Sequence, residues 1–581
     1  MFNCSSLPLP AVLARTLLFL LLTWRLPAAG QAPAWQSARA VAVATAVATT
    51  NYSVVTATAV DAAGNVYLAG IFLNTVALGS TTLSSLGSYD VFVAKFSPAS
   101  NQFLWALRAG GTGSDEAYAL AVSGTSVYVA GNFQSPTADF SATTLINAGD
   151  YDGFVAKLTD AGGTGSFAWA QRVGGTRRDF ASALAVSGTS VYVAGSFEGP
   201  TVGFGPSILS SAGSADAFVA KLIDAGTTGS FAWAQRAGGN WDDGASALVV
   251  SGNGVYVVGG FDSPTAGFGP TTLTNMDAIS GSSDVFVAKL TDAGSTGSFV
   301  WAQRAGGMGD EGASALAVSG TSVYISGAFS SPTVGFGPAT LTNVGSAFSD
   351  VFVAKLIDVG STGSFVWAQQ AGGTGRDIAT GLAVSGSNVY VAGGFGSPTA
   401  GFGSTTLTNA GANAGTPDSF LAKLTDAGST GSFAWAQRAG GTGTDAATAL
   451  ALSGTSVYVV GYFTSLMGGF GPITLANPNP TPNTSVGFLA ALTDPTLTAT
   501  TAATGPREPA TLYPNPARRT ATLRLPAGTA PAPLTLTDAL GRAVRRYPAP
   551  AGAEAALDLG GLPAGLYLLR GAGPAQRLVV E

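Results

Sequence analysis

The chain has 581 residues, of which 80 are Gly and 10% are charged, and it contains no His. The absence of His excludes His-based triads and His-ligated zinc or iron, and it removes the usual general base near neutral pH. Residues 31–494 hold 15 basic and 27 acidic side chains, so this part of the chain has no electrostatic footprint for nucleic acid.

Residues 1–30 predict an export signal. Arg15 precedes the apolar run TLLFLLLTW, and small residues follow at 28–30. This run is too short to span a bilayer comfortably, which favours a cleaved secretory signal over an N-terminal anchor. The only cysteine, Cys4, lies in this segment, so we expect no disulfide in the mature chain. No other stretch approaches eighteen apolar residues, and we expect no membrane span.

Residues 31–494 are built from a repeat of about 66 residues. Four short apolar runs recur in the same order, as in GASALAV (312–318), SVYISGAF (322–329), DVFVAKL (350–356) and SFVWAQQAG (364–372). Each run is rich in Val, Phe, Tyr or Ala and is bounded by Gly, Ser, Thr or Asp, which are strand and turn signals. Four strands per repeat are typical of a β-propeller blade, and a solenoid is the alternative.

The strand count predicts how the propeller is completed. The first three strands each occur seven times, but the fourth occurs only six times before the repeat stops. We expect residues 34–42 to supply the missing strand, to pair with the strand near 487–492, and to place Trp35 where the repeated tryptophan stands. The predicted fold is therefore all-β, a seven-bladed β-propeller closed by an N-terminal strand. Arg39 follows Trp35 by four residues rather than three, which a bulge could absorb.

The phrases GNVYLAG, DVFVAKL and AGGTGSD resemble the SBBP family of β-propeller repeats. The resemblance covers roughly residues 34–494. It implies the propeller fold and an exported protein, and it assigns no chemistry.

A Thr-, Ala- and Pro-rich linker at 495–509 leads to residues 510–581, whose short alternating runs with Gly and Pro turns predict a small Ig-like β-sandwich. This segment resembles the type A C-terminal sorting domain of the type IX secretion system; an accessory Ig-like domain is the alternative. The matching residues are Tyr513, Pro514, Asn515, Pro516, Asp538, Gly541, Arg542, and Gly561 to Tyr567, which include Gly565 and Leu566. The resemblance implies recognition by the type IX machinery and a final location at the outer cell surface of a Gram-negative bacterium or in the medium.

An acidic residue recurs ten positions after each repeated tryptophan. The six acids are Asp115, Asp179, Asp243, Glu311, Asp377 and Asp445. A ring of carboxylates on one face could bind calcium or a glycan, but short acidic side chains also accept backbone N–H groups in Gly-rich turns. Because a feature of nearly every blade is typical of architecture, we expect these acids to be structural, with no metal and no cofactor. The repeated lysine is lost at Ala491 and the acid at Thr45, both at the seventh blade, which favours a contact between lysine and acid.

The candidate binding residues are Trp241, Asp242 and Asp243, since Trp241 is the only propeller tryptophan outside the repeat register. The alternative is that Trp241 folds onto its own blade. The variable segments between second and third strands contain GFG and TL, which predict an extra hairpin, and their variation is typical of recognition loops. We expect no catalytic residues and a scaffold that binds protein or glycan through its loop face. The alternative is a glycoside hydrolase or lyase using Asp242, Asp243, Asp310 and Glu311.

Overall fold

The structure is a computed structural model that describes residues 32–41, 43–44, 52–141, 143–277, 279, 281–345, 347–411, 416–478, 484–497, 511–524, 533–538, 542–550, 554–570 and 576–581. The described part is all-β. The expected signal at 1–30 and Gly541 lie outside the described residues, as does all of the linker except residues 495–497.

Seven four-stranded antiparallel sheets follow one another along the repeat region, and we number them units 1 to 7 by their first strands. The first strands are β3 (Tyr52–Val60), β9 (Asp115–Ser123), β15 (Asp179–Ser187), β21 (Asp243–Ser251), β27 (Glu311–Ser319), β33 (Asp377–Ser385) and β39 (Asp445–Ser453). The second strands are β4 (Val66–Leu73), β10 (Ser126–Phe133), β16 (Ser190–Glu198), β22 (Gly254–Phe261), β28 (Ser322–Phe329), β34 (Asn388–Phe395) and β40 (Ser456–Phe463). The third strands are β7 (Asp90–Ser97), β13 (Asp152–Asp160), β19 (Ala215–Asp224), β25 (Asp284–Asp292), β31 (Asp350–Asp358), β37 (Asp418–Asp426) and β43 (Val486–Thr493).

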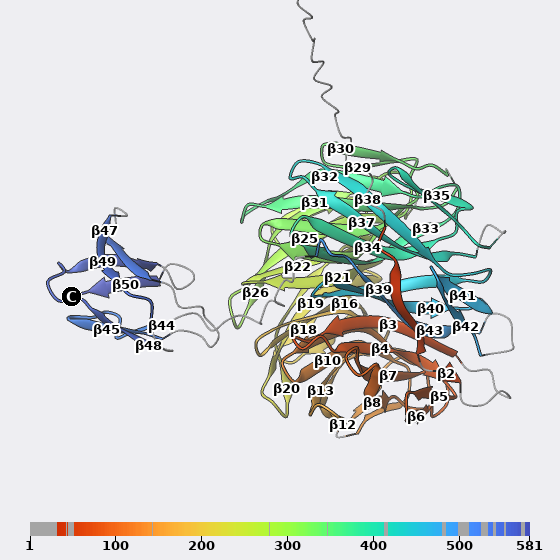
Figure 1. The fold of residues 1–581 in the computed structure, drawn as a ribbon, viewed down its shortest axis with the longest axis horizontal. Coiled ribbons are helices and arrows are strands. Elements are labelled where there is room, and N and C mark those ends of the chain that lie inside the picture. The colour runs from red at the N-terminus through yellow and green to blue at the C-terminus, as the bar shows by residue number, and fades with distance from the viewer. Residues whose placement is uncertain are drawn as a thin grey trace, which may run out of the picture.

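The fourth strands complete each sheet. They are β8 (Gln102–Ala109), β14 (Gly165–Val173), β20 (Gly229–Ala237), β26 (Gly297–Ala305), β32 (Gly363–Ala371), β38 (Gly431–Ala439) and, in unit 7, β1 (Trp35–Val41). The predicted pairing of the N-terminal strand is confirmed, since β1 runs antiparallel to β43 from Trp35 opposite Leu492 to Val41 opposite Gly487. Figure 1 shows this red strand among the blue strands of the last unit.

The register corrects the expected place of Trp35. Ser37 lies opposite Ala491, as Trp169 lies opposite Lys157 in unit 2, so Ser37 occupies the position of the repeated tryptophan. Trp35 instead occupies the position of Phe167 and packs edge-to-face on Phe470, with ring centroids 5.7 Å apart. The Trp35 ring fills that buried apolar site, although its Nε1 has no hydrogen-bond partner among the described residues. This register also explains why Arg39 follows Trp35 by four residues.

The first strands of consecutive units lie against one another, and β39 also lies against β3. Small side chains allow this approach, and hydroxyl groups bridge neighbouring first strands. Thr56 Oγ1 donates to the Ala117 carbonyl at 2.7 Å, and Thr448 Oγ1 donates to the Val55 carbonyl at 2.6 Å. Each apolar core lies between adjacent sheets, and one of them joins Val55 and Leu68 of unit 1 to Val460 and Leu489 of unit 7.

The predicted extra hairpin between second and third strands is confirmed in every unit. The hairpin strands are β5 (Thr75–Leu78), β6 (Thr81–Ser84), β11 (Thr137–Phe140), β12 (Thr143–Ile146), β17 (Val202–Phe204), β18 (Ser207–Leu209), β23 (Thr265–Phe268), β24 (Thr271–Thr274), β29 (Thr333–Phe336), β30 (Ala339–Thr342), β35 (Thr399–Phe402), β36 (Thr405–Thr408), β41 (Met467–Phe470) and β42 (Ile473–Ala476). A short strand, β2 (Val43–Ala44), pairs with β5.

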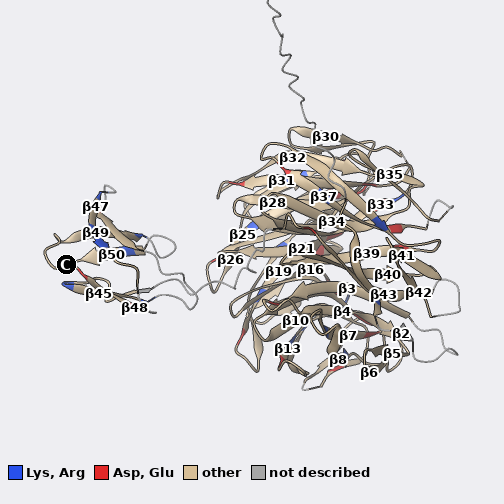
Figure 2. Ribbon diagram, in the orientation of Figure 1, with Lys and Arg blue, Asp and Glu red and all other residues tan. Residues whose placement is uncertain are grey.

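The C-terminal strands form two sheets, β44-β45-β48 and β47-β46-β49-β50, around one apolar core that includes Leu536 and Tyr567. Their bounds are β44 (Thr511–Tyr513), β45 (Thr520–Arg524), β46 (Leu534–Asp538), β47 (Ala543–Tyr547), β48 (Glu554–Asp558), β49 (Gly565–Arg570) and β50 (Gln576–Val580). The ribbon of several of these strands is blue in Figure 2, where Lys and Arg are blue, whereas coloured positions are sparse over the repeat units.

Candidate functional site

The face where the first strands begin carries six pairs of buried acids, which we call the face pairs. They are Asp90/Asp115, Asp152/Asp179, Asp216/Asp243, Asp284/Glu311, Asp350/Asp377 and Asp418/Asp445. Each pair joins the third strand of one unit to the first strand of the next, and in five of the six pairs both carboxylates lie beside the same glycine. A Cβ on Gly238 would lie 2.1 Å from Asp216 Oδ1 and 2.7 Å from Asp243 Oδ2, and its φ of +143° also requires glycine.

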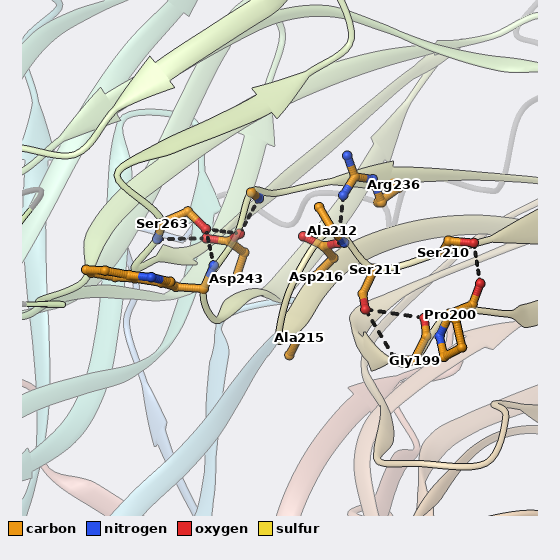
Figure 3. A network of polar contacts seen from close by, with 12 residues as sticks. Gly199, Pro200, Ser210, Ser211, Ala212, Ala215, Asp216, Arg236, Asp243 and Ser263 are labelled. Atoms are coloured by element: carbon orange, nitrogen blue, oxygen red, sulfur yellow. Dashed lines mark hydrogen bonds and ion pairs between the residues drawn. The ribbon is translucent and has the colours of Figure 1, made fainter.

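The repeated acids use their carboxylates internally (Figure 3). Asp243 Oδ2 accepts the Gly239 N–H at 2.6 Å and the Ser263 hydroxyl at 2.7 Å, while Oδ1 accepts the Ser263 N–H at 3.3 Å. Its partner Asp216 accepts Arg236 Nη1 at 2.7 Å through Oδ2. Asp216 Oδ1 is buried and has no hydrogen-bond partner among the described residues. The pairs therefore hold the turn that leads into each first strand.

Burial makes these carboxyl groups reluctant to ionise. It raises the pKa of Asp179 and of Glu311 to about 7, and the nearby Asp152 and Asp284 carboxylates add to the respective shifts. Burial likewise raises the pKa of Asp243 to about 6. Hydrogen bonds from backbone N–H groups oppose burial at every one of these acids but do not overcome it.

The expected contact between repeated lysine and repeated acid is wrong. Lys95 Nζ lies 2.5 Å from Asp160 Oδ2, at the end of the next unit's third strand and therefore at the opposite end of the sheet from the face pairs. Tyr67 donates to the same oxygen at 2.7 Å, and Trp105 Nε1 donates to Asp160 Oδ1 at 2.9 Å. The lysine side chain reaches across to the neighbouring unit, so its partner is about 65 residues away in the chain.

This arrangement, the junction network, recurs between successive units. Its lysine–aspartate pairs are Lys95–Asp160, Lys157–Asp224, Lys221–Asp292, Lys289–Asp358, Lys355–Asp426 and Lys423–Asp494. Burial alone would raise the pKa of these aspartates, but the donated hydrogen bonds outweigh it and lower the pKa, to about 2 at Asp494. In unit 1, Ser53 stands at the position of the repeated acid, and its N–H donates to the Ser485 carbonyl. The expected position, Thr45, is therefore not the equivalent one, and it lies outside the described residues.

The three candidate binding residues have different surroundings. Asp243 is only 3% exposed and its carboxylate accepts hydrogen bonds from the turn, although the residue forms part of a cavity wall. Asp242 is exposed, and its Oδ1 accepts the Ala215 N–H at 3.1 Å. Trp241 is half-buried and lies against Gly281 of unit 4, where a Cβ would be 3.4 Å from the indole ring. Trp241 thus packs beside Gly281 of unit 4.

A cavity of about 290 Å³ opens beside Asp242. Its walls include Asp242, Asp262 and Ser283, and glycines at 244 and 260 provide the space. Burial raises the pKa of Asp262, and the carboxylates of Asp242 and Asp310 raise it further. Of the four carboxylates proposed for hydrolysis, Asp243 and Glu311 are buried, whereas Asp262 was missed. Its signal in the sequence is a carboxylate that one other unit shares, as Glu198, where the remaining units carry Leu73, Gln134, Ser330, Gly396 and Thr464.

Aromatic residues break the repeat on the same face in units 1 to 3. Tyr118 is 36% exposed where the other first strands carry Ser or Thr, and its hydroxyl donates to Glu116 Oε2 at 2.6 Å. It lines a cavity of about 260 Å³ between the first strands. Tyr151 stacks on Phe180 with ring centroids 5.7 Å apart. A second aromatic pair lies in unit 1, where Tyr52 and Tyr89 meet edge-to-face at 5.1 Å. Their departure from the repeat was visible in the sequence.

Several sorting-motif residues of the tail form hydrogen bonds or ion pairs within it. Asn515 joins the first tail strand to the last, because its Nδ2 donates to the Arg577 carbonyl at 2.8 Å and its Oδ1 accepts the Val579 N–H at 2.9 Å. Arg542 Nε donates to Asp538 Oδ2 at 2.8 Å, and the buried Tyr567 donates to the Pro563 carbonyl at 2.7 Å. The side chains of Tyr513 and Leu566 stay exposed.

Residues 511–579 match the family model described as the secretion system C-terminal sorting domain. The match supports export of the chain through type IX secretion, to the cell surface or beyond. It confirms the sorting domain that the tail motifs predict. No curated protein matches the sequence.

Solved structures resemble the chain only distantly. A protein of unknown function from Dyadobacter fermentans is 10% identical over 79% of this chain and all of its own, with a TM-score of 0.34. The parainfluenza virus 5 hemagglutinin-neuraminidase is 11% identical over 80% of this chain and 96% of its own, with a TM-score of 0.34. A europium-containing methanol dehydrogenase is 10% identical over 72% of this chain and 82% of its own, with a TM-score of 0.32. At such scores none of these likenesses assigns a function.

The described residues contain no helix long and apolar enough to cross a membrane. They also contain no group of three or more His, Cys, Asp or Glu side chains placed to hold a metal ion.

Proposed function

We propose that the protein is an exported seven-bladed β-propeller, completed by its N-terminal strand, that binds a protein or glycan through the face where the first strands begin. The sorting domain at 511–579 supports export. The seven sheets, the pairing of β1 with β43 and the contact of β39 with β3 support the architecture. Residues 510–581 would be recognised by the type IX machinery, and the mature chain would be displayed on the cell or released.

The observation that carries the binding role is the loss of symmetry on this face. The exposed Tyr118 stands where the other first strands carry Ser or Thr, Tyr151 stacks on Phe180, and Glu116 is an acid at a position where no other first strand carries one. Exposed aromatic rings beside carboxylates are the groups that stack on sugar rings and bond their hydroxyls, and aromatic residues also dominate protein interfaces. Side chains that break a repeat on a rigid frame are favoured for recognition.

The face pairs are better suited to architecture than to binding. Their carboxylates are buried and accept N–H and hydroxyl groups of the turns. We therefore assign Asp115, Asp179, Asp243, Glu311, Asp377 and Asp445 a structural role. Asp242 remains the candidate ligand contact of the original three, with Trp241 buttressing its loop.

A glycoside hydrolase or lyase is the second candidate. It is favoured by the cavity beside Asp262, because burial and the carboxylates of Asp242 and Asp310 raise the pKa of Asp262, and a raised pKa is typical of a general acid. The symmetric burial of Asp243 and Glu311 argues against the version that uses those two residues.

The experiment is a glycan array and a cell-surface pulldown with the mature protein, residues 31–581, and its Tyr118→Ala variant. The proposal predicts a specific ligand that Tyr118→Ala loses while its melting temperature is kept. Val359→Ala, at an exposed residue near the other end of unit 5, is the matched control and should bind as the wild type does. Polysaccharide turnover abolished by Asp262→Asn without loss of folding would establish the enzyme instead.

A further inference from the structure

The junction between unit 7 and unit 1 lacks the junction network. The register places Ser37 where the other units carry tryptophan, and Ala491 where they carry lysine. Pro98 stands three residues after Lys95, where the neighbouring units carry the aspartate. Only the tyrosine is kept, as Tyr458, which lies opposite Ala491 as Tyr67 lies opposite Lys95. The tryptophan, lysine and aspartate of the other junctions are thus replaced by three uncharged residues, and Ser37 and Ala491 are much smaller than the tryptophan and lysine.

The space they leave is a cavity of about 210 Å³. Ser37, Pro98, Tyr458 and Ala491 line it, so the replaced positions form its walls. Pro98 and Phe96 add apolar surface, and Asn101 adds an amide. The cavity lies at the end of the sheets remote from the face proposed for binding, and it is independent of that proposal.

Arg39 lines this cavity and places a positive charge there, although it does not occupy the position of the repeated lysine. Its guanidinium lies 4.1 Å from the centre of the Phe96 ring, and it donates to the side chain and the carbonyl of Asn101. Burial lowers the pKa of Arg39, and no carboxylate among the described residues compensates for that burial. A half-buried guanidinium whose partners are neutral retains donors suited to a carboxylate.

We propose that this cavity, named the seam site and defined by Ser37, Arg39, Pro98, Asn101, Tyr458 and Ala491, binds the carboxylate of a small ligand. At the six other junctions a tyrosine hydroxyl and a cation hold one carboxylate oxygen together, as Tyr67 and Lys95 hold Asp160. The seam site keeps the tyrosine and a cation but supplies no carboxylate of its own. The apolar walls favour a ligand with a hydrophobic body attached to the acid group.

The chemistry favours a carboxylate over a phosphate. The junction network is satisfied by a planar group with a single negative charge, and the seam site offers one guanidinium to balance such a charge. A doubly charged phosphate in a half-buried site would need a second cation, and the lysine that could provide it is Ala491 here.

The test is isothermal titration calorimetry of the mature protein with sodium benzoate, using benzamide as the uncharged analogue. The proposal predicts saturable binding of one benzoate per chain and none of benzamide. Arg39→Gln should weaken benzoate binding by about tenfold or more, because a hydrogen-bonded charge is lost. Arg178→Gln, at an exposed arginine paired with Asp150, is the matched control and should leave binding unchanged.

A second variant fills the site from within. Pro98→Asp combined with Ala491→Lys restores the aspartate and lysine of the other junctions, so it should raise the melting temperature and abolish benzoate binding. The proposal is overturned if wild type shows no saturable binding, if benzamide binds equally well, or if Arg39→Gln binds benzoate as tightly as wild type does. The Arg39→Gln comparison decides the matter even if the double variant does not fold.

Discussion

At the scale of residues, the pKa values of two kinds of buried aspartate are shifted in opposite directions. Asp160 and its equivalents are held ionised by lysine, tyrosine and tryptophan donors from the previous unit. Asp179 and its equivalents face a second carboxylate across a glycine, and burial favours their protonated form. The first kind secures neighbouring units to each other, and the second shapes the turns on the opposite face.

Asp160→Ala should destabilise the protein by about 3–5 kcal/mol, because it leaves the buried Lys95 without a counter-charge. Chemical denaturation should show this as a lower midpoint. Asp150→Ala removes an exposed partner of Arg178 and is the control, with no measurable change expected. Equal midpoints for the two variants would show that the junction network adds nothing to stability.

The two kinds of aspartate predict a stability maximum at mildly acidic pH. The face-pair acids have a raised pKa in the folded state, so the folded chain binds more protons, and stability falls as pH rises from about 4 to about 7. The junction aspartates have a lowered pKa, so their contribution is lost as pH falls below about 4. Melting temperature measured from pH 3 to pH 8 should therefore peak near pH 4–5.

Asp179→Asn mimics the protonated form and should flatten the decline above pH 5. Added calcium should leave the whole profile unchanged, because the face pairs are assigned no metal. A melting temperature that rises steadily to pH 8, or a calcium-dependent increase, would contradict this account.

At the scale of elements, the sequence predicts the strands and turns that each short run of residues determines by itself. Strand and turn signals recur in the same order, so the four strands of each unit, the extra hairpins and the pairing of β1 could be predicted by counting. The register of β1 could not, because Trp35 suits an aromatic site two residues away from the repeated tryptophan. The partner of Lys95 was also missed, since it lies in the next unit. The joint loss of lysine at Ala491 and aspartate at Pro98 was its available signal.

Trp35→Ala tests the contribution of β1 to the fold. The side chain is buried against Phe470, so its removal should cost about 3–5 kcal/mol of unfolding free energy. Gln36→Ala, next to it and exposed, should have little effect. A small cost at Trp35 would mean that β1 is dispensable for the stability of the unit 7 sheet.

At the scale of the whole molecule, the sorting domain and the repeat units are expected to act independently, one for export and the other for binding. Deleting residues 510–581 should retain the protein inside the envelope of the cells that produce it. The repeat units should keep their melting temperature. Fractionation of cells and medium measures the first, and thermal denaturation the second. Unchanged delivery to the surface without residues 510–581 would contradict the role of the tail.

The completion of the repeat region by its N-terminal strand is tested most directly by a disulfide. Ala38 lies opposite Ala490 in the β1–β43 register, and directly opposed residues in antiparallel strands are within disulfide reach. The only cysteine of the sequence, Cys4, precedes residue 31, so Ala38→Cys with Ala490→Cys introduces the only two thiols of a protein that comprises residues 31–581. Mass spectrometry of the oxidised protein should find them joined within one chain, whereas Ala38→Cys with Ala354→Cys, at the equivalent position of unit 5, should stay reduced. Free thiols in the first variant, or equal linkage in both, would contradict the proposed closure.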